Sequence, residues 1–152
     1  MDNNLIVKNA DTVKVKNEIS AMAVVFCNNK ILAISENIYG KESVSLPKGH
    51  KENGEHELQT AIRECFEETN LVITEQQLVK ELAHFSYEFL SPNNLLIIKE
   101  IIPYLFNVEN EGNPIAKEER ISFVNWMDVE EFFKKCSYKN VKSVVESALK
   151  EL

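Results

Sequence analysis

The sequence predicts an α/β protein of the α+β kind, with a mixed central β-sheet flanked by helices. Apolar strand patterns lie on both sides of one clear helix, and two further helical patterns close the chain. A length of 152 residues is close to the usual size of one domain. We therefore expect one domain over residues 1–152.

The first part of the chain is predicted to consist of strands. Alternating residues indicate an edge strand over 12–16, and the apolar runs 19–27 and 31–34, separated by a polar turn, indicate a hairpin. Residues 36–55 are polar and contain three glycines and a proline. This composition is typical of a loop.

The best-defined helix is predicted over residues 55–69. Asn70 follows it, where a left-handed C-cap would end the helix. The residues that recur at helical spacing and form its apolar stripe are Leu58, Ala61, Ile62, Cys65 and Thr69.

The second half is predicted to form strands over 78–89 and 95–108, a polar loop over 109–120 and a short strand over 121–126. Asp128 with Glu131 three residues on predicts a capping box that starts a helix. Another helix is expected to begin near Ser137. Its predicted apolar face consists of Val141, Val144, Val145, Ala148, Leu149 and Leu152.

The composition excludes several classes of protein. A formal net charge of -7 disfavours broad binding to DNA or to anionic membranes. The three cysteines are widely spaced, so neither a disulfide framework nor a structural zinc site is indicated. No basic leader precedes a long apolar run, and no stretch approaches the length of a membrane span. We expect a soluble, cytoplasmic protein whose oligomeric state the sequence leaves open.

Three carboxylates gather on one face of the 55–69 helix. At about 100° per residue, Glu64, Glu67 and Glu68 fall within one sector about 100° wide. Like charges at these spacings repel one another, and a hard divalent cation with oxygen ligands would relieve the repulsion. The neighbouring Arg63 could orient one carboxylate through a bidentate contact. For an isolated glutamate-rich helix, a merely solvated acidic face is the better interpretation.

The preceding loop changes that interpretation, because loop and helix together resemble the signature box of the Nudix hydrolase family. The resemblance spans residues 49–71 and departs from the pattern at one position, where Asn70 replaces the usual second glycine. Asn tolerates the left-handed conformation, so the turn should survive. The residues that carry the resemblance are Gly49, Glu55, Arg63, Glu64, Glu67, Glu68 and Leu71.

The resemblance implies an α/β/α sandwich fold and magnesium-dependent hydrolysis of a diphosphate linkage in a nucleotide-like small molecule, with manganese as a substitute ion. It implies a metal site at Glu64, Glu67 and Glu68, joined by the backbone carbonyl of Gly49. Arg63 would hold the carboxylates in register, and Glu55 would support them.

The resemblance implies that Glu67, Glu64 and Arg63 are catalytic residues of the box, and it leaves the catalytic base open between the box and a carboxylate on a separate loop. Glu118 and Glu119, just before the 121–126 strand, are the external candidates, with Glu118 preferred. Taken alone, this acidic pair is more often a solvated loop.

The segment 46–50 is similar to that of the diadenosine polyphosphate hydrolase branch of the family. This resemblance implies that Lys48 and Lys99 contact phosphate, that Tyr104 contacts phosphate or stacks on a base, and that His50 lines the mouth of the site. Each of these residues also has an ordinary structural interpretation. That interpretation is preferred outright for a second set of residues, His56, His84, Cys65 and Trp126.

Two other functions remain open at this point. One is another hydrolytic activity, on nucleoside triphosphates, nucleotide sugars or capped RNA ends. The other is a module that senses a nucleotide without hydrolysing it. Because all three glutamates of the box are present, catalysis is the better prediction.

Overall fold

The computed structural model describes the backbone of residues 3–8 and 11–152, and the side chains from residue 14 onward. In this part of the chain, nine strands form one mixed sheet. The strands are β1 (Asn3–Lys8), β2 (Asp11–Cys27), β3 (Lys30–Ile38), β4 (Lys41–Ser45), β5 (Lys48–His50), β6 (Leu78–Glu81), β7 (Phe85–Leu90), β8 (Leu95–Asn107) and β9 (Ile121–Asp128).

The centre of the sheet is the parallel pair β2 and β8, which stay in register from Lys14 opposite Leu95 to Phe26 opposite Asn107. β3 pairs with β2 only near the hairpin, at Phe26 and Cys27, and then leaves it for β4 and β9. The short β5 pairs with Ser20–Met22 of β2 where β3 has moved away. This divergence opens the sheet where the predicted loop crosses it.

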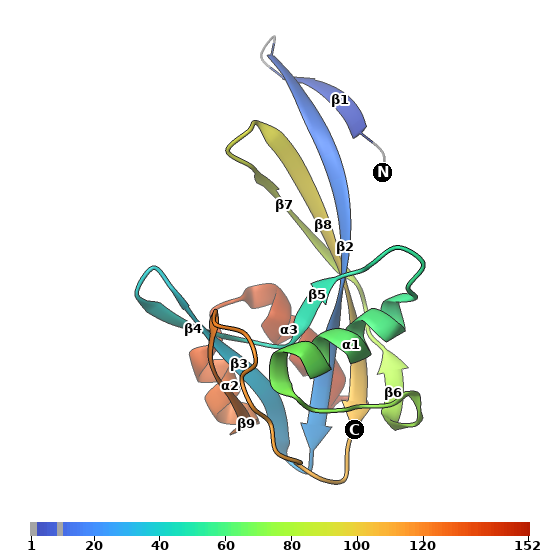
Figure 1. Cartoon of the computed structure of the whole chain (residues 1–152), viewed down its shortest axis with the longest axis vertical. Helices are drawn as coiled ribbons and strands as arrows, with labels where there is room; N and C mark the ends of the chain where they lie inside the picture. Colours follow the sequence, from blue (N-terminus) through green and yellow to red (C-terminus); the bar gives the residue numbers. More distant parts are fainter. Residues whose placement is uncertain (1–2, 9–10) are drawn as a thin grey trace.

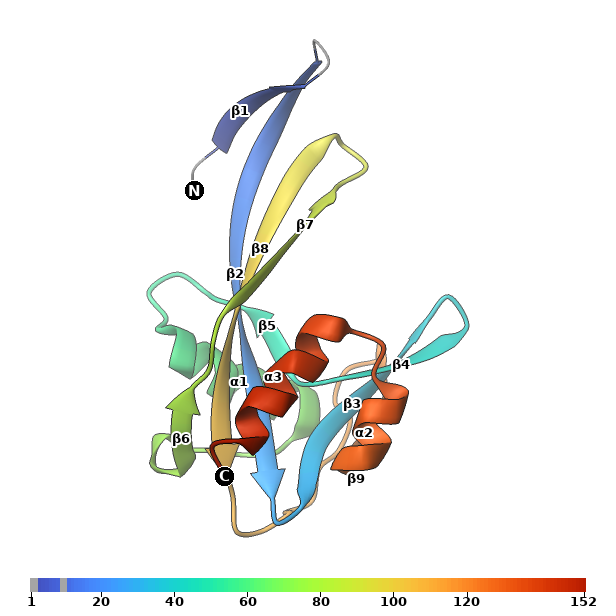
Figure 2. The same ribbon diagram turned by 180° about the vertical axis from the view of Figure 1, so that it is seen from behind.

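Helices cover both faces of the sheet (Figures 1 and 2). α1 (Glu57–Thr69) lies on one face, and α2 (Val129–Lys135) and α3 (Lys139–Leu149) lie on the other. A 3₁₀ turn, η1 (Glu75–Gln77), precedes β6. The predicted α+β sandwich with a mixed sheet is therefore confirmed.

Alternation along β2 divides its side chains between two cores. Ala21, Ala23 and Val25 pack with the α1 side, whereas Met22 and Val24 pack with the helices of the opposite face. Since each side chain of this run is fully buried, β2 reads as a continuous apolar stretch. That is the physical reason why the hairpin prediction succeeded.

Beyond the two cores, β1, the first half of β2, β7 and the first half of β8 project from the body (Figures 1 and 2). The prediction of an edge strand over 12–16 is wrong. Lys14 is opposite Leu5 of β1 on one side and Leu95 of β8 on the other. The alternation reflects a strand without a helix on either face, not one at an edge.

Several boundaries also differ from the predictions. The expected loop over 36–55 contains the end of β3 and the strands β4 and β5, because their backbones pair although their side chains are largely polar. The expected strand over 78–89 is interrupted at residues 82–84, since β6 and β7 pair with different halves of β8.

The last two helices begin close to the predicted positions. Asp128 is the N-cap of α2 as expected but makes no side-chain capping bond, and α3 starts at Lys139, close to Ser137. The predicted apolar face of α3 is buried except for Leu149 and Leu152, which lie 39% and 52% exposed at the end of the chain, past the edge of the core. In the described residues, no helix has the length and apolarity to cross a membrane.

Candidate functional site

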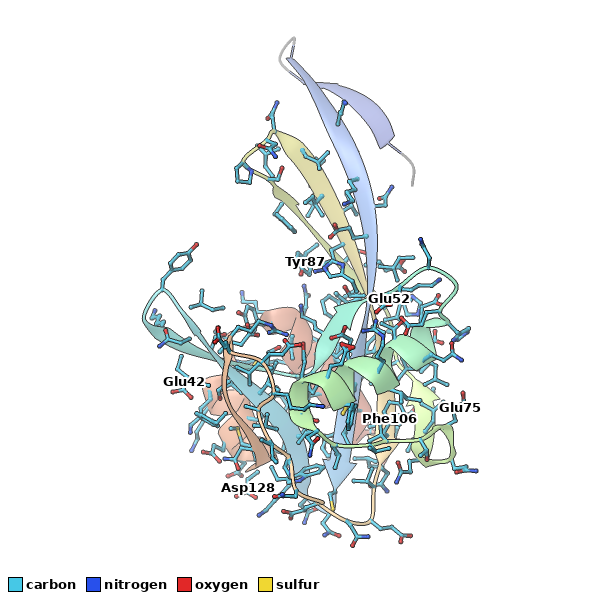
Figure 3. The ribbon with its side chains drawn as sticks, viewed as in Figure 1. Glu42, Glu52, Glu75, Tyr87, Phe106 and Asp128 are labelled. Atoms are coloured by element: carbon cyan, nitrogen blue, oxygen red, sulfur yellow. The ribbon has the colours of Figure 1, made fainter. Side chains whose placement is uncertain are left out.

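A cavity of about 540 Å³ lies where β3 and β2 diverge, between β5, α1 and the segment that leads into β9. It brings together residues from five parts of the chain, most of them charged. Its walls are formed by Ile34, Glu36, Lys48, Gly49, His50, Glu52, Arg63, Glu64, Glu67, Glu68, Lys99, Glu118 and Arg120. Glu52, labelled in Figure 3, lies in the loop between β5 and α1.

The ends of α1 set the position of the cavity's acidic wall. His56 is the N-cap: its Nδ1 accepts from the Leu58 amide at 3.1 Å, and its own amide donates to the side chain of Gln59 at 3.2 Å. The helix thus begins at Glu57, two residues later than predicted. Asn70 ends it in the left-handed conformation, with φ of 66°, as expected.

Gly49 leaves the space that the carboxyl group of Glu64 occupies. A Cβ at this position would collide with the carboxyl group of Glu64. Only glycine therefore lets the β5 backbone approach this side chain. Burial raises the pKa of Glu64, although Arg63 opposes the shift.

Arg63 organises the carboxylates around it. Its Nε and Nη2 donate to the two oxygens of Glu55 at 2.7 and 3.0 Å, and its Nη1 donates to Glu64 at 2.8 Å and to Glu67 at 3.0 Å. Nη2 also donates to the backbone carbonyl of His50 at 2.8 Å. The hydrogen bonds from Arg63 lower the pKa of Glu55 to about 2. One guanidinium thus ties the helix to the loop before it.

Glu68 is the most buried charge of the site, with its side chain 1% exposed. Burial raises its pKa to about 7, and the positive charge of Arg120 opposes the shift. One carboxylate oxygen accepts from the Lys48 amide at 3.2 Å, and the other accepts from Arg120. A carboxylate in this setting needs a positive partner to stay ionised.

The opposite wall carries positive charge. Nζ of Lys99 lies 3.5 Å from Nε2 of His50. Burial, followed by the charge of Lys99, lowers the pKa of both Lys48 and His50. The cavity is therefore bipolar, with carboxylates on α1 facing two lysines on β5 and β8.

Four residues that line this cavity were not predicted from the sequence: Ile34, Glu36, Glu52 and Arg120. Arg120 donates to Glu36 at 3.1 Å and to Glu118 at 3.0 Å in addition to its bond with Glu68. Glu36 follows the buried run of β3, and a charged residue directly after a buried strand was a usable signal. Nothing in the local sequence distinguishes Arg120 from a surface arginine.

The donors fit a hard divalent cation in chemical type, since several carboxylates share one cavity and two of them have raised pKa values. As the side chains stand, however, no three His, Cys, Asp or Glu groups in the described part of the chain are close enough together to hold a metal ion. The same carboxylates are paired with two arginines. Arg63 holds Glu64 and Glu67, and Arg120 holds Glu68.

Tyr104, predicted to bind substrate, lies outside the charged cavity. Its side chain is 4% exposed, packs in the core beneath α1 and does not line the cavity, because alternation along β8 turns it to the face opposite Lys99. Burial raises the pKa of its hydroxyl to about 12. Cys65 and Trp126 are core residues as expected, and His84 lies elsewhere, between Glu81 and Glu100.

Comparison with known protein families agrees with this geometry. The sequence model of the NUDIX domain matches residues 16–147, which is nearly the whole chain. The chain belongs to the Nudix family. No curated protein shows a significant sequence match to it.

Solved Nudix structures share the fold at low sequence identity. The NUDIX domain of Shewanella oneidensis NrtR, complexed with ADP ribose, has a TM-score of 0.71 at 15% identity, over 89% of this chain and 88% of that one. A C. elegans Ap4A hydrolase has a TM-score of 0.66 at 21% identity, over 86% and 93%.

A MutT/nudix family protein from Enterococcus faecalis has a TM-score of 0.58 at 24% identity over 73% of this chain. The match spans only 43% of that longer protein. This Nudix chain thus has a hydrolase fold, whose structural neighbours include proteins named for different nucleotide derivatives.

Proposed function

We propose that this Nudix chain hydrolyses a diphosphate linkage in a nucleoside diphosphate derivative, with magnesium as its metal and manganese as a substitute. The observation that carries the proposal is the bipolar cavity, in which glutamates of α1 face Lys48 and Lys99. Carboxylates suit a divalent cation, and lysines suit the phosphates of a substrate. A polyphosphate spanning the cavity would meet both.

Glu64, Glu67 and Glu68, together with the Gly49 carbonyl, are the proposed metal ligands. A bound divalent cation supplies charge neutralisation and lowers the pKa of a bound water. Arg63 keeps Glu64 and Glu67 on the cavity wall, and Glu55 holds Arg63 in turn. Lys48, Lys99 and His50 are proposed to position the phosphates.

In the proposed reaction, a water oxygen forms a bond to phosphorus and the phosphoanhydride P–O bond breaks. The leaving phosphate takes the electron pair, and a carboxylate takes the proton of the water. Two candidates for this base lie on the cavity wall, Glu67 on α1 and Glu118 before β9. Their side chains are 43% and 36% exposed, so both are accessible to a water molecule.

A second cavity supports a nucleotide substrate. It has a volume of about 480 Å³ and shares Glu36 and Lys48 with the first. Three aromatic side chains, Phe85, Tyr87 and Tyr138, line it. Aromatic faces suit a flat nucleobase. A substrate whose phosphates occupy the charged cavity would therefore place its nucleoside in the adjoining aromatic cavity.

The first candidate substrate is a dinucleoside polyphosphate, supported by residues 46–50 and by the fold shared with the Ap4A hydrolase. The test is to incubate the chain with diadenosine tetraphosphate, a nucleoside triphosphate and ADP-ribose, each with magnesium or with a chelator, and to identify the released phosphate products.

We expect magnesium-dependent cleavage with the dinucleoside polyphosphate as the best substrate. Faster cleavage of another compound would reassign the substrate and keep the hydrolase. Nucleotide binding without turnover under any metal condition would instead support a sensing module.

A further inference from the structure

Arg120 is a second arginine of the cavity wall, and it belongs to no part of the family box. Its guanidinium pairs with three carboxylates from three segments: Glu36 of β3 at 3.1 Å, Glu118 of the preceding loop at 3.0 Å, and Glu68 of α1. The first two partners are partly exposed. Glu68 is 1% exposed and depends on Arg120 for its counter-charge.

The backbone around Arg120 holds it in this position. The pairing of β3 with β9 shifts register between Ser35 and Glu36, and the hydroxyl of Ser122 donates to the Ser35 carbonyl at 3.0 Å. Irregularities of this kind re-aim the side chains next to them. Arg120, directly before β9, reaches Glu68 of α1 while its side chain stays 47% exposed.

The loop before Arg120 is also fastened to α1. The Ile115 amide donates to the Thr69 carbonyl at 2.8 Å, and Nζ of Lys117 lies 3.6 Å from the centre of the Phe66 ring. Arg120 thus contacts Glu68 from a segment held on the same helix. The backbone and side-chain contacts of this segment therefore hold Arg120 and Glu68 next to each other.

We propose that Arg120 is an internal counter-ion that competes with a divalent cation for Glu68, so that the Arg120–Glu68 ion pair and metal binding at Glu68 exclude each other. This inference rests on the proposed metal site. A cation at Glu68 would have to use oxygens already bonded to Arg120 and to the Lys48 amide. It would also stand beside a guanidinium of the same sign.

Arg120 remains held on the cavity wall after such an exchange, because Glu36 and Glu118 still pair with it. It is therefore a positioning residue, which sets how strongly the cavity takes up metal and where Glu118 lies.

The test is the affinity of the chain for Mg²⁺ alone, measured by titration calorimetry and repeated with Mn²⁺. Arg120→Gln should bind either ion about tenfold more tightly than the wild type, within the usual range for coupling between two ligands. The matched control is Lys99→Gln. It removes the same charge from the same cavity, but Lys99 is not a partner of Glu68.

An equal gain in both variants would overturn the proposal, because general electrostatics would then explain it. Unchanged or weaker binding by Arg120→Gln would also overturn it. A second readout is thermal unfolding. In chelator, Arg120→Gln should melt below the wild type, since Glu68 is left buried without its partner, and added Mg²⁺ should close that gap.

If Arg120→Gln does not fold, Arg120→Lys serves instead. It keeps the charge without the planar guanidinium and should bind Mg²⁺ more tightly than the wild type by a smaller factor. An affinity equal to that of the wild type would count against competition.

Glu68→Gln distinguishes a failure of the proposed metal site from a failure of the proposed role of Arg120. If it binds Mg²⁺ as well as the wild type, the proposed metal site itself fails. If it loses Mg²⁺ while Arg120→Gln changes nothing, only the role of Arg120 fails.

Discussion

The helices α1 and α3 cover opposite faces of the same sheet, and both bury an apolar stripe. Ala61 and Cys65 of α1 are as fully buried as Val145 and Ala148 of α3. Their polar faces differ. Seven carboxylates pair with Arg63 and Arg120 beside α1, whereas no side chain of α3 takes part in an ion pair within the part of the chain that the structure describes.

This difference separates folding from chemistry. An apolar stripe is sufficient to dock a helix on a sheet, as α3 demonstrates. Neighbouring like charges on α1 add a cost that docking does not require. Like charges that are close together and that docking does not require are therefore the better guide to function. Substitutions on α1 and α3 should distinguish an effect on activity from an effect on stability.

The largest expected effect is on activity, at α1. Glu67→Gln should lower kcat about 10³-fold, because the amide can neither act as a base nor carry the charge that a divalent cation needs. The fold should persist, since this side chain is 43% exposed. Steady-state kinetics and thermal unfolding measure the two effects. Glu146→Gln on the exposed face of α3 is the control, and wild-type turnover in Glu67→Gln would remove the contrast between the helices.

On α3 the large effect should fall on stability instead. Val145→Ala deletes two buried methyl groups and should lower the free energy of unfolding by about 2 kcal/mol. Urea denaturation measures the change, and kcat should stay within about twofold of the wild type. A loss of activity without a loss of stability would show that α3 takes part in the chemistry.

A smaller, pH-dependent effect is expected at the loop that Arg63 ties to α1. Glu55 has a folded pKa of about 2 against an ordinary value of 4.5. Its ion pair with Arg63 therefore contributes stability that is full above about pH 4.5 and is lost as the pH falls through about 2.

Glu55→Gln should accordingly be about 1–2 kcal/mol less stable than the wild type at pH 7. The difference should shrink as the pH is lowered from 4.5 towards 2, as followed by urea denaturation along a pH series. A gap that stays constant with pH would mean that the lost stabilisation is packing rather than charge.

The smallest effect is expected where the two helices end. Asn70 is left-handed with φ of 66°, whereas the cap of α3, Lys150, is right-handed. Asn70→Ala should cost about 1 kcal/mol and Asn70→Gly should stay within about 0.5 kcal/mol of the wild type. Lys150→Ala should change little by the same denaturation assay. Equal costs at both caps would contradict the conformational explanation.

Local patterns predicted the elements whose structure depends on burial. The β2–β3 hairpin, the body of α1 and the left-handed end at Asn70 each follow from periodicity or from a residue's own conformational preference. The boundaries failed where backbone pairing decides. β4 and β5 form because their neighbours offer hydrogen bonds, and polar side chains conceal this.

In the candidate site too, some features could be predicted from local sequence and others could not. Fixed spacing along 49–71 predicts that Gly49, Arg63 and the glutamates face one another, since one loop and one helix carry them all. The position of Tyr104 outside the cavity could not be predicted in this way, because the face on which a strand residue lies depends on register and not on its place in a motif.

The sequence by itself determined the fold class, the Nudix family and the acidic face of α1, because each depends on residues close together along the chain. Only the tertiary structure decided that Arg120 and Glu36 complete the cavity, that Lys48 and Lys99 oppose its glutamates, and that Tyr104 lies in the core. These contacts join segments distant in the sequence, and their geometry arises where β3 leaves β2 and where the shifted β9 ladder brings Arg120 next to Glu68.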